Sequence, residues 1–318
     1  MRRPPRRTYS LIALSAFAAV VVGCAGVPSS GASKPGPTAK VTTRATDPSP
    51  GSSAPGGSGS TKPSQPKPKL KSPFAGLASF VAATPYHITA AVYDARTGRT
   101  WLLDPNPGVP EHTASIVKVE IMGAVLKKVN AAGDPLSTDE NSLMHTMIEN
   151  SDNDSATSLW WDAGGPSAIQ RFDDEVGMTG TTASTLQWIP GSDDLPGWGW
   201  TTTTALDQVS LVKDFVFPNS LLTTADQSYA QSLMESIEAD QDWGVNGGVP
   251  AGVTVALKNG WLPLDLAGAG SNWQVNSIGW IHGNGRDYVL AVLTQGGPTE
   301  QAGIDAIEHI SAQVYERL

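Results

Sequence analysis

Three short polar clusters in this sequence combine residue types that could activate a serine hydroxyl. The first pairs Ser115 with Lys118, so both side chains face the same side of a helix, one turn apart. Serine is a weak nucleophile at neutral pH and needs a base within hydrogen-bonding distance. A lysine can serve as that base where burial or a neighbouring cation lowers its pKa. The pair therefore predicts a nucleophile and its general base.

The spacing Ser-x-x-Lys is common, and residues 64–67 and 210–213 repeat it. The first repeat lies in a low-complexity stretch and the second lies inside a predicted helix without a partner motif. Ser115 differs because two further polar motifs, at residues 151–153 and 258–260, follow it along the chain. Ser151-Asp152-Asn153 falls between two predicted helices, where a short loop can direct side chains into a cleft. Lys258-Asn259-Gly260 falls on a predicted strand.

The periodicity of apolar residues predicts the elements that must position these clusters. Alternation over residues 87–103 predicts a hairpin that turns at residues 96–98. Helices are predicted over residues 115–129, 137–148, 154–161, 203–215, 224–238 and 299–318, and strands over 252–261, 272–283 and 286–295. Strands at both ends with helices between them predict an α/β (α+β) fold. Its five-stranded antiparallel sheet would be built from both termini, with flanking helices and a reduced all-helical subdomain.

The order S-x-x-K, S-D-N, K-x-G resembles the motif set of the class A β-lactamases and the penicillin-binding DD-peptidases. The likeness spans residues 73–318, including the segment WTTTTALDQVSLV. It implies a serine hydrolase that forms an acyl-enzyme with a β-lactam or a D-Ala-D-Ala wall peptide, and it implies no metal or cofactor. The alternative is a catalytically lapsed lipoprotein of the same fold that binds wall peptide or glycan. An acyl hydrolase acting on an unrelated ester is a further alternative.

The resemblance implies a role for each matching residue. Ser115 would attack the carbonyl, and Lys118 would take its proton. Ser151 would relay a proton to the leaving nitrogen, while Lys258 would tune Ser151 and attract a carboxylate. Asn153 would hold the substrate amide. Further substrate contacts would come from Asn259, Gly260, Trp261 and Leu262, and the oxyanion hole from the backbone N–H of Ser115 and one near Leu262.

The loop at residues 184–204 departs from the family pattern. The family removes the acyl group with a glutamate on this loop, and counting back from the threonines places that position near Gln187 or Trp188. Neither side chain can take a proton from water. Asp193 and Asp194 are the only carboxylates in the loop, either as substitutes or as surface turn residues. We therefore predict slow deacylation and a long-lived acyl-enzyme.

Two other positions bear on substrate binding. The family's carboxylate-binding arginine has no evident counterpart, since the segment VNSIG offers only Asn276 and Ser277, and Arg286 is expected to face solvent. Several tryptophans could either stack on sugars or wall peptide, or fill core volume. Trp261 is the one we expect to touch ligand. The segments expected to rim the cleft contain Trp188, Trp198, Trp200, Trp243, Trp261 and Trp273.

Charge and histidine spacing exclude several function classes. Residues 73–318 contain ten Lys and Arg against 29 Asp and Glu, a net charge of −19. This argues against binding to nucleic acid or docking of the domain on anionic lipid. The five histidines show no metal-ligand spacing, so no metal site is predicted. We expect a monomer that acts on a small-molecule or peptidoglycan-peptide substrate.

The N-terminal residues predict a lipid-anchored, exported protein. Four arginines precede an apolar run over residues 11–22, which is too short to span a bilayer but suits a secretory signal. The run ends at Cys24, the only cysteine, in a pattern similar to a bacterial lipobox. We predict a signal peptide at residues 1–23, with palmitate or a similar lipid on Cys24. Sec and Tat export both stay open.

Residues 24–72 are rich in Pro, Gly, Ser and Lys, with almost no large apolar side chains. Such a composition cannot bury enough surface to offset the entropy of ordering, so a disordered tether is predicted. Its net charge is +6. Either this charge favours an anionic lipid surface, or the lysines simply keep the tether soluble. The predicted location is the extracytoplasmic face of the bacterial cell membrane.

Overall fold

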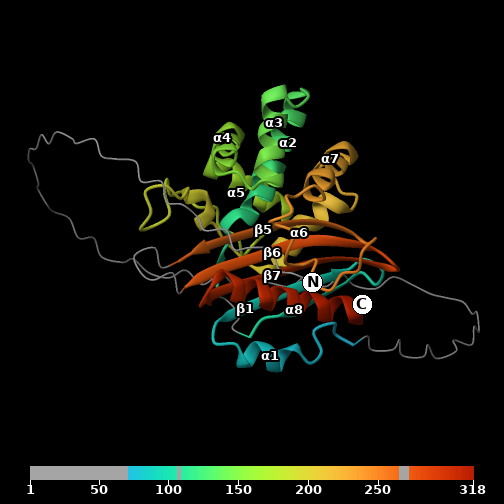
Figure 1. Ribbon diagram of the computed structural model, residues 1–318. Helices are drawn as coiled ribbons and strands as arrows, with labels where there is room; N and C mark the ends of the chain where they lie inside the picture. The colour runs from blue at the N-terminus through green and yellow to red at the C-terminus, as the bar shows by residue number, and fades with distance from the viewer. Residues whose placement is uncertain (1–70, 106–108, 265–271) are drawn as a thin grey trace, which may run out of the picture. The chain divides into compact units, whose positions relative to one another are not determined.

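The computed structural model describes residues 71–105, 109–264 and 272–318 (Figure 1). The predictions for the signal peptide, Cys24, the Ser-x-x-Lys repeat at 64–67 and nearly all of the tether lie outside these residues. In the described part of the chain, no helix is both long enough and apolar enough to cross a membrane.

A five-stranded antiparallel sheet forms the centre of the fold. Its spatial order is β2-β1-β7-β6-β5, so strands from the two ends of the sequence meet in the middle. In that central pair Ala91 lies opposite Ala291. The sheet and its hairpins confirm the prediction from strand periodicity. Its strands are β1 (His87–Asp94), β2 (Arg99–Leu103), β5 (Thr254–Pro263), β6 (Trp273–Gly283) and β7 (Arg286–Gly297).

Helices cover both faces of the sheet. α1 (Leu77–Ala83) and α8 (Glu300–Arg317) lie on one face, and the other helices lie on the opposite face (Figure 1). Because successive side chains on a strand point to opposite faces, β1 contributes to both cores. Ala90 and Val92 pack in the cluster that includes α8, whereas Ala91 packs in the cluster that includes the other helices.

The helical part confirms most of the predicted helices and adds two. The capping box at Ser137 and Glu140 is present, with each side chain bonded to the other residue's backbone N–H. The short α1 and the helix α5 were not predicted. α5 begins at Pro166, directly after Gly164-Gly165, and this Gly-Gly-Pro stretch reads as a loop in sequence. The helices on this face are α2 (Lys118–Ala132), α3 (Thr138–Glu149), α4 (Asn153–Ala163), α5 (Pro166–Val176), α6 (Ala205–Val216) and α7 (Thr224–Met234).

Four short elements shape the loops next to the sheet edge. They are β3 (Glu111–His112), the 3₁₀ turn η1 (Ala114–Val117), the 3₁₀ turn η2 (Gly197–Trp200) and β4 (Thr202–Thr203). β3 pairs with β4, so the segment before Ser115 is tied to the segment that ends the 184–204 loop. Ser115 belongs to η1, so it lies in a 3₁₀ turn rather than in the first turn of an α-helix.

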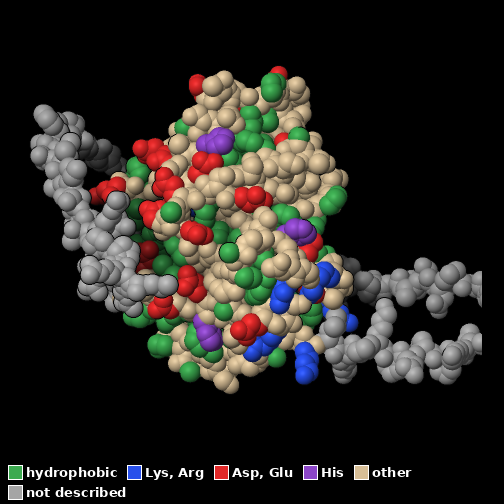
Figure 2. All heavy atoms as spheres, turned by 45° about the vertical axis from the view of Figure 1, so that its right-hand side comes forward, with side chains coloured by type: hydrophobic (Ala, Val, Ile, Leu, Met, Phe, Trp, Pro, Cys, Tyr) green, Lys and Arg blue, Asp and Glu red, His purple; other side chains and the backbone are tan. Residues whose placement is uncertain are grey.

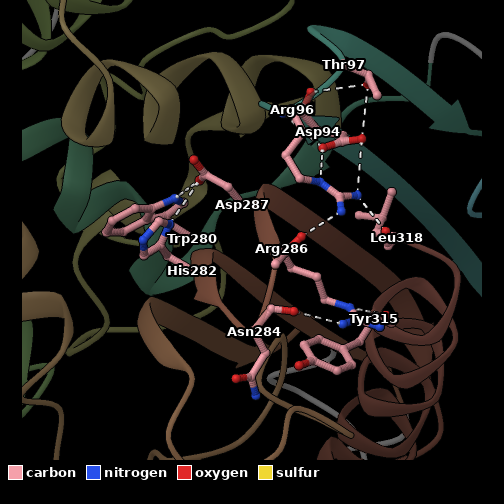
Figure 3. Close-up of polar contacts among 11 residues, drawn as sticks. Asp94, Arg96, Thr97, Trp280, His282, Asn284, Arg286, Asp287, Tyr315 and Leu318 are labelled. Carbon is pink, nitrogen blue, oxygen red and sulfur yellow. Dashed lines mark hydrogen bonds and ion pairs between the residues drawn. The ribbon is translucent and has the colours of Figure 1, made fainter.

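Arg286 packs against α8 instead of facing solvent (Figure 3). Its guanidinium carbon lies 4.0 Å from the ring centre of Tyr315, and Nε donates to the Tyr315 carbonyl at 2.7 Å. Arg96 makes a matching contact, since it donates to the carbonyls of Gly285 and Leu318. The two arginines thus hold the end of α8 against the hairpins, and the prediction that Arg286 is solvent-facing is wrong.

Candidate active site

Ser115 sits on a backbone held by β6. Asn276 of β6 is fully buried, and its amide donates to the carbonyls of His112 and Thr113 at 2.8 and 3.0 Å. Ala114 then adopts φ of 47°, a left-handed conformation that costs energy for a residue other than glycine. Strain of this kind collects where a surrounding structure fixes a functional geometry. Asn276, considered from sequence only as a carboxylate ligand, instead positions the segment that presents Ser115.

Gly260 lets β5 approach the backbone of Ser115. A Cβ at this position would lie 2.6 Å from the Ser115 nitrogen, which no side chain tolerates. The close approach places Gly260 of β5 directly against the backbone of Ser115. Successive N–H groups on a strand point to opposite sides. The N–H groups of Trp261 and Leu262 therefore cannot both point toward the Ser115 N–H.

Lys118 brings the first two motifs together. Its side chain is fully buried, and Nζ lies 3.0 Å from Ser115 Oγ and 3.1 Å from Ser151 Oγ. Nζ also contacts the Asn153 side-chain oxygen at 2.8 Å and the Ser151 carbonyl at 2.6 Å. The amine therefore lies between the two serine hydroxyls, with oxygen partners that fix its position.

Ser151 and Lys258 complete the cluster. Ser151 adopts φ of 55° directly before α4, whose first turn is capped by the Asp152 side chain accepting from the Ser155 N–H at 2.7 Å. Lys258 of β5 donates from Nζ to Ser151 Oγ at 2.9 Å. Four polar side chains from η1, α2, the turn before α4 and β5 thus meet at one point.

Burial sets the protonation of both lysines. It lowers the pKa of Lys118 well below its ordinary value, and the nearby Lys258 charge lowers that pKa further, against an opposing effect of Asp152. Burial also lowers the pKa of Lys258 to about 7. A lowered pKa favours the neutral amine of Lys118 over its ammonium. A neutral amine in contact with Ser115 Oγ can accept its proton.

The 184–204 loop brings an indole, not a carboxylate, to Lys118. The ring centre of Trp198 lies 5.1 Å from Lys118 Nζ, and its Nε1 donates to Thr157 Oγ1 at 3.0 Å. Gln187 and Trp188, where counting placed the family's glutamate, are exposed and lie in a neighbouring cleft. Residues 187–197 fold into a small turn of their own, with the Gly197 N–H bonded to the Gln187 carbonyl.

Asp193 and Asp194 do not line the Ser115 pocket. Both are exposed in the same neighbouring cleft, and Asp194 accepts a hydrogen bond from Ser192 at 2.7 Å. The interpretation of these residues as surface turn residues therefore fits the structure better than a role in deacylation. Among the described residues that line the Ser115 pocket, none is a carboxylate.

Asn259 points away from the pocket, which corrects its predicted contact with substrate. Its amide hydrogens go to the carbonyls of Gln241 and Trp243 at 2.8 and 2.9 Å, and the side chain is almost completely buried. Ser277 of β6 is used in a similar way, since its hydroxyl accepts from the Val245 N–H at 3.0 Å. Both side chains anchor the loop before β5 rather than bind a ligand.

The pocket at Ser115 is small and largely apolar. It has a volume of about 40 Å³ and includes Asn153, Trp261 and Leu262, as predicted for ligand contacts. Ile189 and Leu195 of the loop close it from the other side. Ile189, Leu262 and Ala114 form a buried apolar cluster, so the loop packs directly on the edge strand.

The six tryptophans expected around the cleft divide between positions that line a pocket and positions that pack against neighbouring side chains. Trp198 and Trp261 line the Ser115 pocket, and Trp188 lines the neighbouring cleft. Trp200 stacks on His112 with ring centres 3.7 Å apart, and Trp243 lies 5.8 Å from Trp261. Trp243, Trp261 and Trp273 also pack against the core shared with α8.

The remaining sequence candidates are structural. Ser210 donates to the Leu206 carbonyl, and Lys213 Nζ lies 4.3 Å from the ring centre of Tyr93, so this Ser-x-x-Lys pair forms no dyad. Within the described ranges, no three His, Cys, Asp or Glu side chains are grouped to hold a metal ion.

Comparison with solved structures shows the fold. A class A β-lactamase from Bacteroides cellulosilyticus is 18% identical, with a TM-score of 0.66, over 77% of this chain and 96% of that one. An ancestral class A β-lactamase, reconstructed for Gram-negative bacteria, is 20% identical over 78% of this chain and 100% of its own, with a TM-score of 0.64. The protein named PBP-A is 18% identical, covering 77% and 94%, with a TM-score of 0.62.

The sequence comparison is consistent with this fold. No curated protein matches the sequence. A sequence model of the beta-lactamase enzyme family matches residues 133–318, which contain Ser151 and Lys258, while Ser115 lies before the matched part. The match covers more than half of the chain. The chain therefore belongs to the beta-lactamase enzyme family.

Proposed function

We propose that this protein is an exported serine acyl-enzyme that reacts with a β-lactam or a D-Ala-D-Ala wall peptide. The observation that carries the proposal is the contact of 3.0 Å between Lys118 Nζ and Ser115 Oγ. A buried amine at this distance is a general base in position for a serine nucleophile. The family membership supports a hydrolase, and the local geometry supports the choice of nucleophile.

The reaction balances within the cluster. Lys118 takes the Ser115 proton while Oγ bonds to the substrate carbonyl carbon, and the C–N bond then breaks. The proton passes through Ser151 to the leaving nitrogen, because Ser151 Oγ lies 3.1 Å from Lys118 Nζ. Lys258 donates to the same hydroxyl, which favours its role as a relay and leaves positive charge near the substrate. The backbone N–H of Ser115 and one of β5 would hold the oxyanion.

Deacylation is proposed to be slow. The resemblance implies that the base for the hydrolytic water comes from the 184–204 loop. Beside Lys118 that loop presents Trp198, whose indole N–H, donated to Thr157, cannot accept a proton. Loss of a positioned general base costs about 10² to 10⁴ in rate. The acyl-enzyme should therefore persist, which suits a DD-peptidase or a penicillin-binding protein better than a resistance enzyme.

We also propose that the chain is exported and held at the extracytoplasmic membrane surface. The basic start, the apolar run over 11–22 and the single Cys24 support cleavage before Cys24 and lipidation of its thiol. The tether over 24–72 would then separate the domain from the bilayer. Incorporation of labelled palmitate into the wild type, and its loss in Cys24→Ala, would test this anchor.

A fluorescent penicillin tests the chemistry directly. The full chain should form a covalent adduct that survives denaturing electrophoresis, and Ser115→Ala should abolish it. Ser210→Ala is the matched control, because it removes the serine of another Ser-x-x-Lys pair and should label normally. Decay of the label over hours, rather than seconds, would support slow deacylation. Rapid decay would instead show a working deacylation route.

The second candidate is a non-catalytic binder of wall peptide. The lining of the Ser115 pocket favours it, because none of the described lining residues is a carboxylate and binding, unlike turnover, needs no deacylation base. Absence of labelling in a folded wild-type protein would favour this candidate over the acyl-enzyme. Ester hydrolysis without penicillin labelling would indicate a hydrolase for a different substrate.

A further inference from the structure

A second cleft adjoins the Ser115 pocket. It has a volume of about 380 Å³ and lies between α4 and residues 186–198 of the loop. Asn153, Pro196 and Trp198 line both spaces. A ligand that entered the cleft would therefore lie next to the nucleophile, although nothing in the proposed reaction uses the cleft.

Exposed apolar side chains collect in this cleft. Trp161 is 63% exposed, Trp188 44% and Leu186 40%. These are half of the large exposed apolar side chains in the described part of the chain, and all three line the same cleft. Trp161 rests on Trp160 with ring centres 4.6 Å apart, so it is held in place while most of its surface stays open. Clustered exposure of this kind marks a binding surface.

The charges in the cleft have one sign. Asp154, Asp193 and Asp194 line it, and no Lys, Arg or His among the described residues does so. The three carboxylates give the cleft a negative charge, which would attract an incoming cation. The wider surface shows the same imbalance: Figure 2 shows acidic side chains spread over much of one face and basic ones gathered at one side.

We propose that the cleft binds a cationic group, such as the primary ammonium of an amine-bearing peptide side chain. Tryptophan faces attract ammonium groups through the ring quadrupole, and the carboxylates add charge complementarity. A neutral sugar could stack on the same rings but would leave the negative charge of the cleft unbalanced. The identification of this cation with part of the substrate rests on the proposed function, since it requires a reaction at Ser115.

Binding can be measured without any reaction. We would titrate the full-length Ser115→Ala protein with the diamine cadaverine and follow tryptophan fluorescence. The expected result is saturable quenching that weakens as salt is raised. Trp161→Ala and Trp188→Ala should each weaken binding by about threefold to tenfold, the size of one cation–π or surface ion-pair contact.

A matched charge control separates the cleft from general attraction to an acidic protein. Asp193→Asn/Asp194→Asn should weaken binding, whereas Asp139→Asn/Asp240→Asn, which removes the same charge from exposed sites elsewhere, should not. Equal weakening in both double variants, no saturable quenching, or quenching by N-acetylglucosamine but not by cadaverine would each overturn the proposal.

The reaction itself supplies a second measurement. If the cation belongs to the substrate, ampicillin, which bears an ammonium, should acylate the wild type faster than benzylpenicillin, which lacks one. The preference should shrink about threefold to tenfold in Asp193→Asn/Asp194→Asn, with benzylpenicillin labelling unchanged. Cadaverine binding without labelling would refute the acyl-enzyme alone. Labelling without cadaverine binding would refute the cation site alone.

Discussion

Asp173 offers a quantitative test of how the helical part is held together. It lies on α5, fully buried, and neither carboxylate oxygen has a hydrogen-bond partner among the described residues. Burial, with the charges of Asp174 and Asp207, raises the pKa of Asp173 to about 8. The folded protein should therefore keep this carboxyl protonated at neutral pH. The perturbation is Asp173→Asn, which keeps the shape and removes the titration.

The direction in which Asp173 changes the stability with pH follows from how many protons the folded and unfolded states bind. The unfolded chain ionises Asp173 near its ordinary pKa of about 4, whereas the fold holds the proton up to about pH 8. Stability from this group is therefore complete below about pH 4 and falls as pH rises, by about 1.4 kcal/mol per unit. At pH 7 the accumulated cost is about 4 kcal/mol, an upper limit for the gain from Asp173→Asn. Unpaired amide hydrogens in the variant would subtract a pH-independent amount, about 1–3 kcal/mol.

The assay is urea unfolding at about pH 5, 6, 7 and 8 at constant ionic strength. The free energy of unfolding of the wild type should fall across this range. That of Asp173→Asn should fall less steeply, because the variant lacks the one proton that Asp173 retains on folding. Some slope should persist, because burial also raises the pKa of Glu120. Asp240→Asn, at an exposed position, is the control and should follow the wild type. Parallel curves for the wild type and Asp173→Asn would refute the reasoning.

Three further predictions concern the active site. Asn276→Ala should slow penicillin labelling at least tenfold and lower the free energy of unfolding by about 2–4 kcal/mol, because it removes the side-chain amide that donates to two backbone carbonyls before Ser115; labelling at the wild-type rate by the folded variant would contradict this. Lys258→Met should slow labelling to a similar extent. It should also stabilise the protein below about pH 7, because the wild type must bury a charged ammonium there. Urea unfolding at pH 6 should show a higher free energy of unfolding for the variant, and a lower one would refute the prediction. Trp198→Glu should shorten the label's half-life at least tenfold, because a carboxylate beside Lys118 can activate water; an unchanged half-life in folded protein would count against the role given to the indole.

The sequence by itself determined the five strands of the sheet, most of the helices and their order, but not α1 or α5. Alternation of apolar residues identified the strands because a half-buried strand must place every second side chain in the core. The capping residues at Ser137 and Glu140 marked the start of α3 for a local reason, namely the unpaired N–H groups of a first turn. The motif order also identified Ser115, Lys118 and Ser151 as residues to examine together. Local chemistry was sufficient for the strands and the helix start, whereas the set of site residues came from the resemblance to a known motif order.

Only the tertiary structure decided which polar side chains face the pocket. Asn259 and Asn276 have the same side-chain chemistry, but one anchors the loop before β5 and the other supports the backbone before Ser115. Trp198 replaced Gln187 as the loop residue beside Lys118 because the loop folds on itself through contacts that no spacing rule contains. The lowered pKa of Lys118 has the same origin, since burial depends on elements distant in sequence.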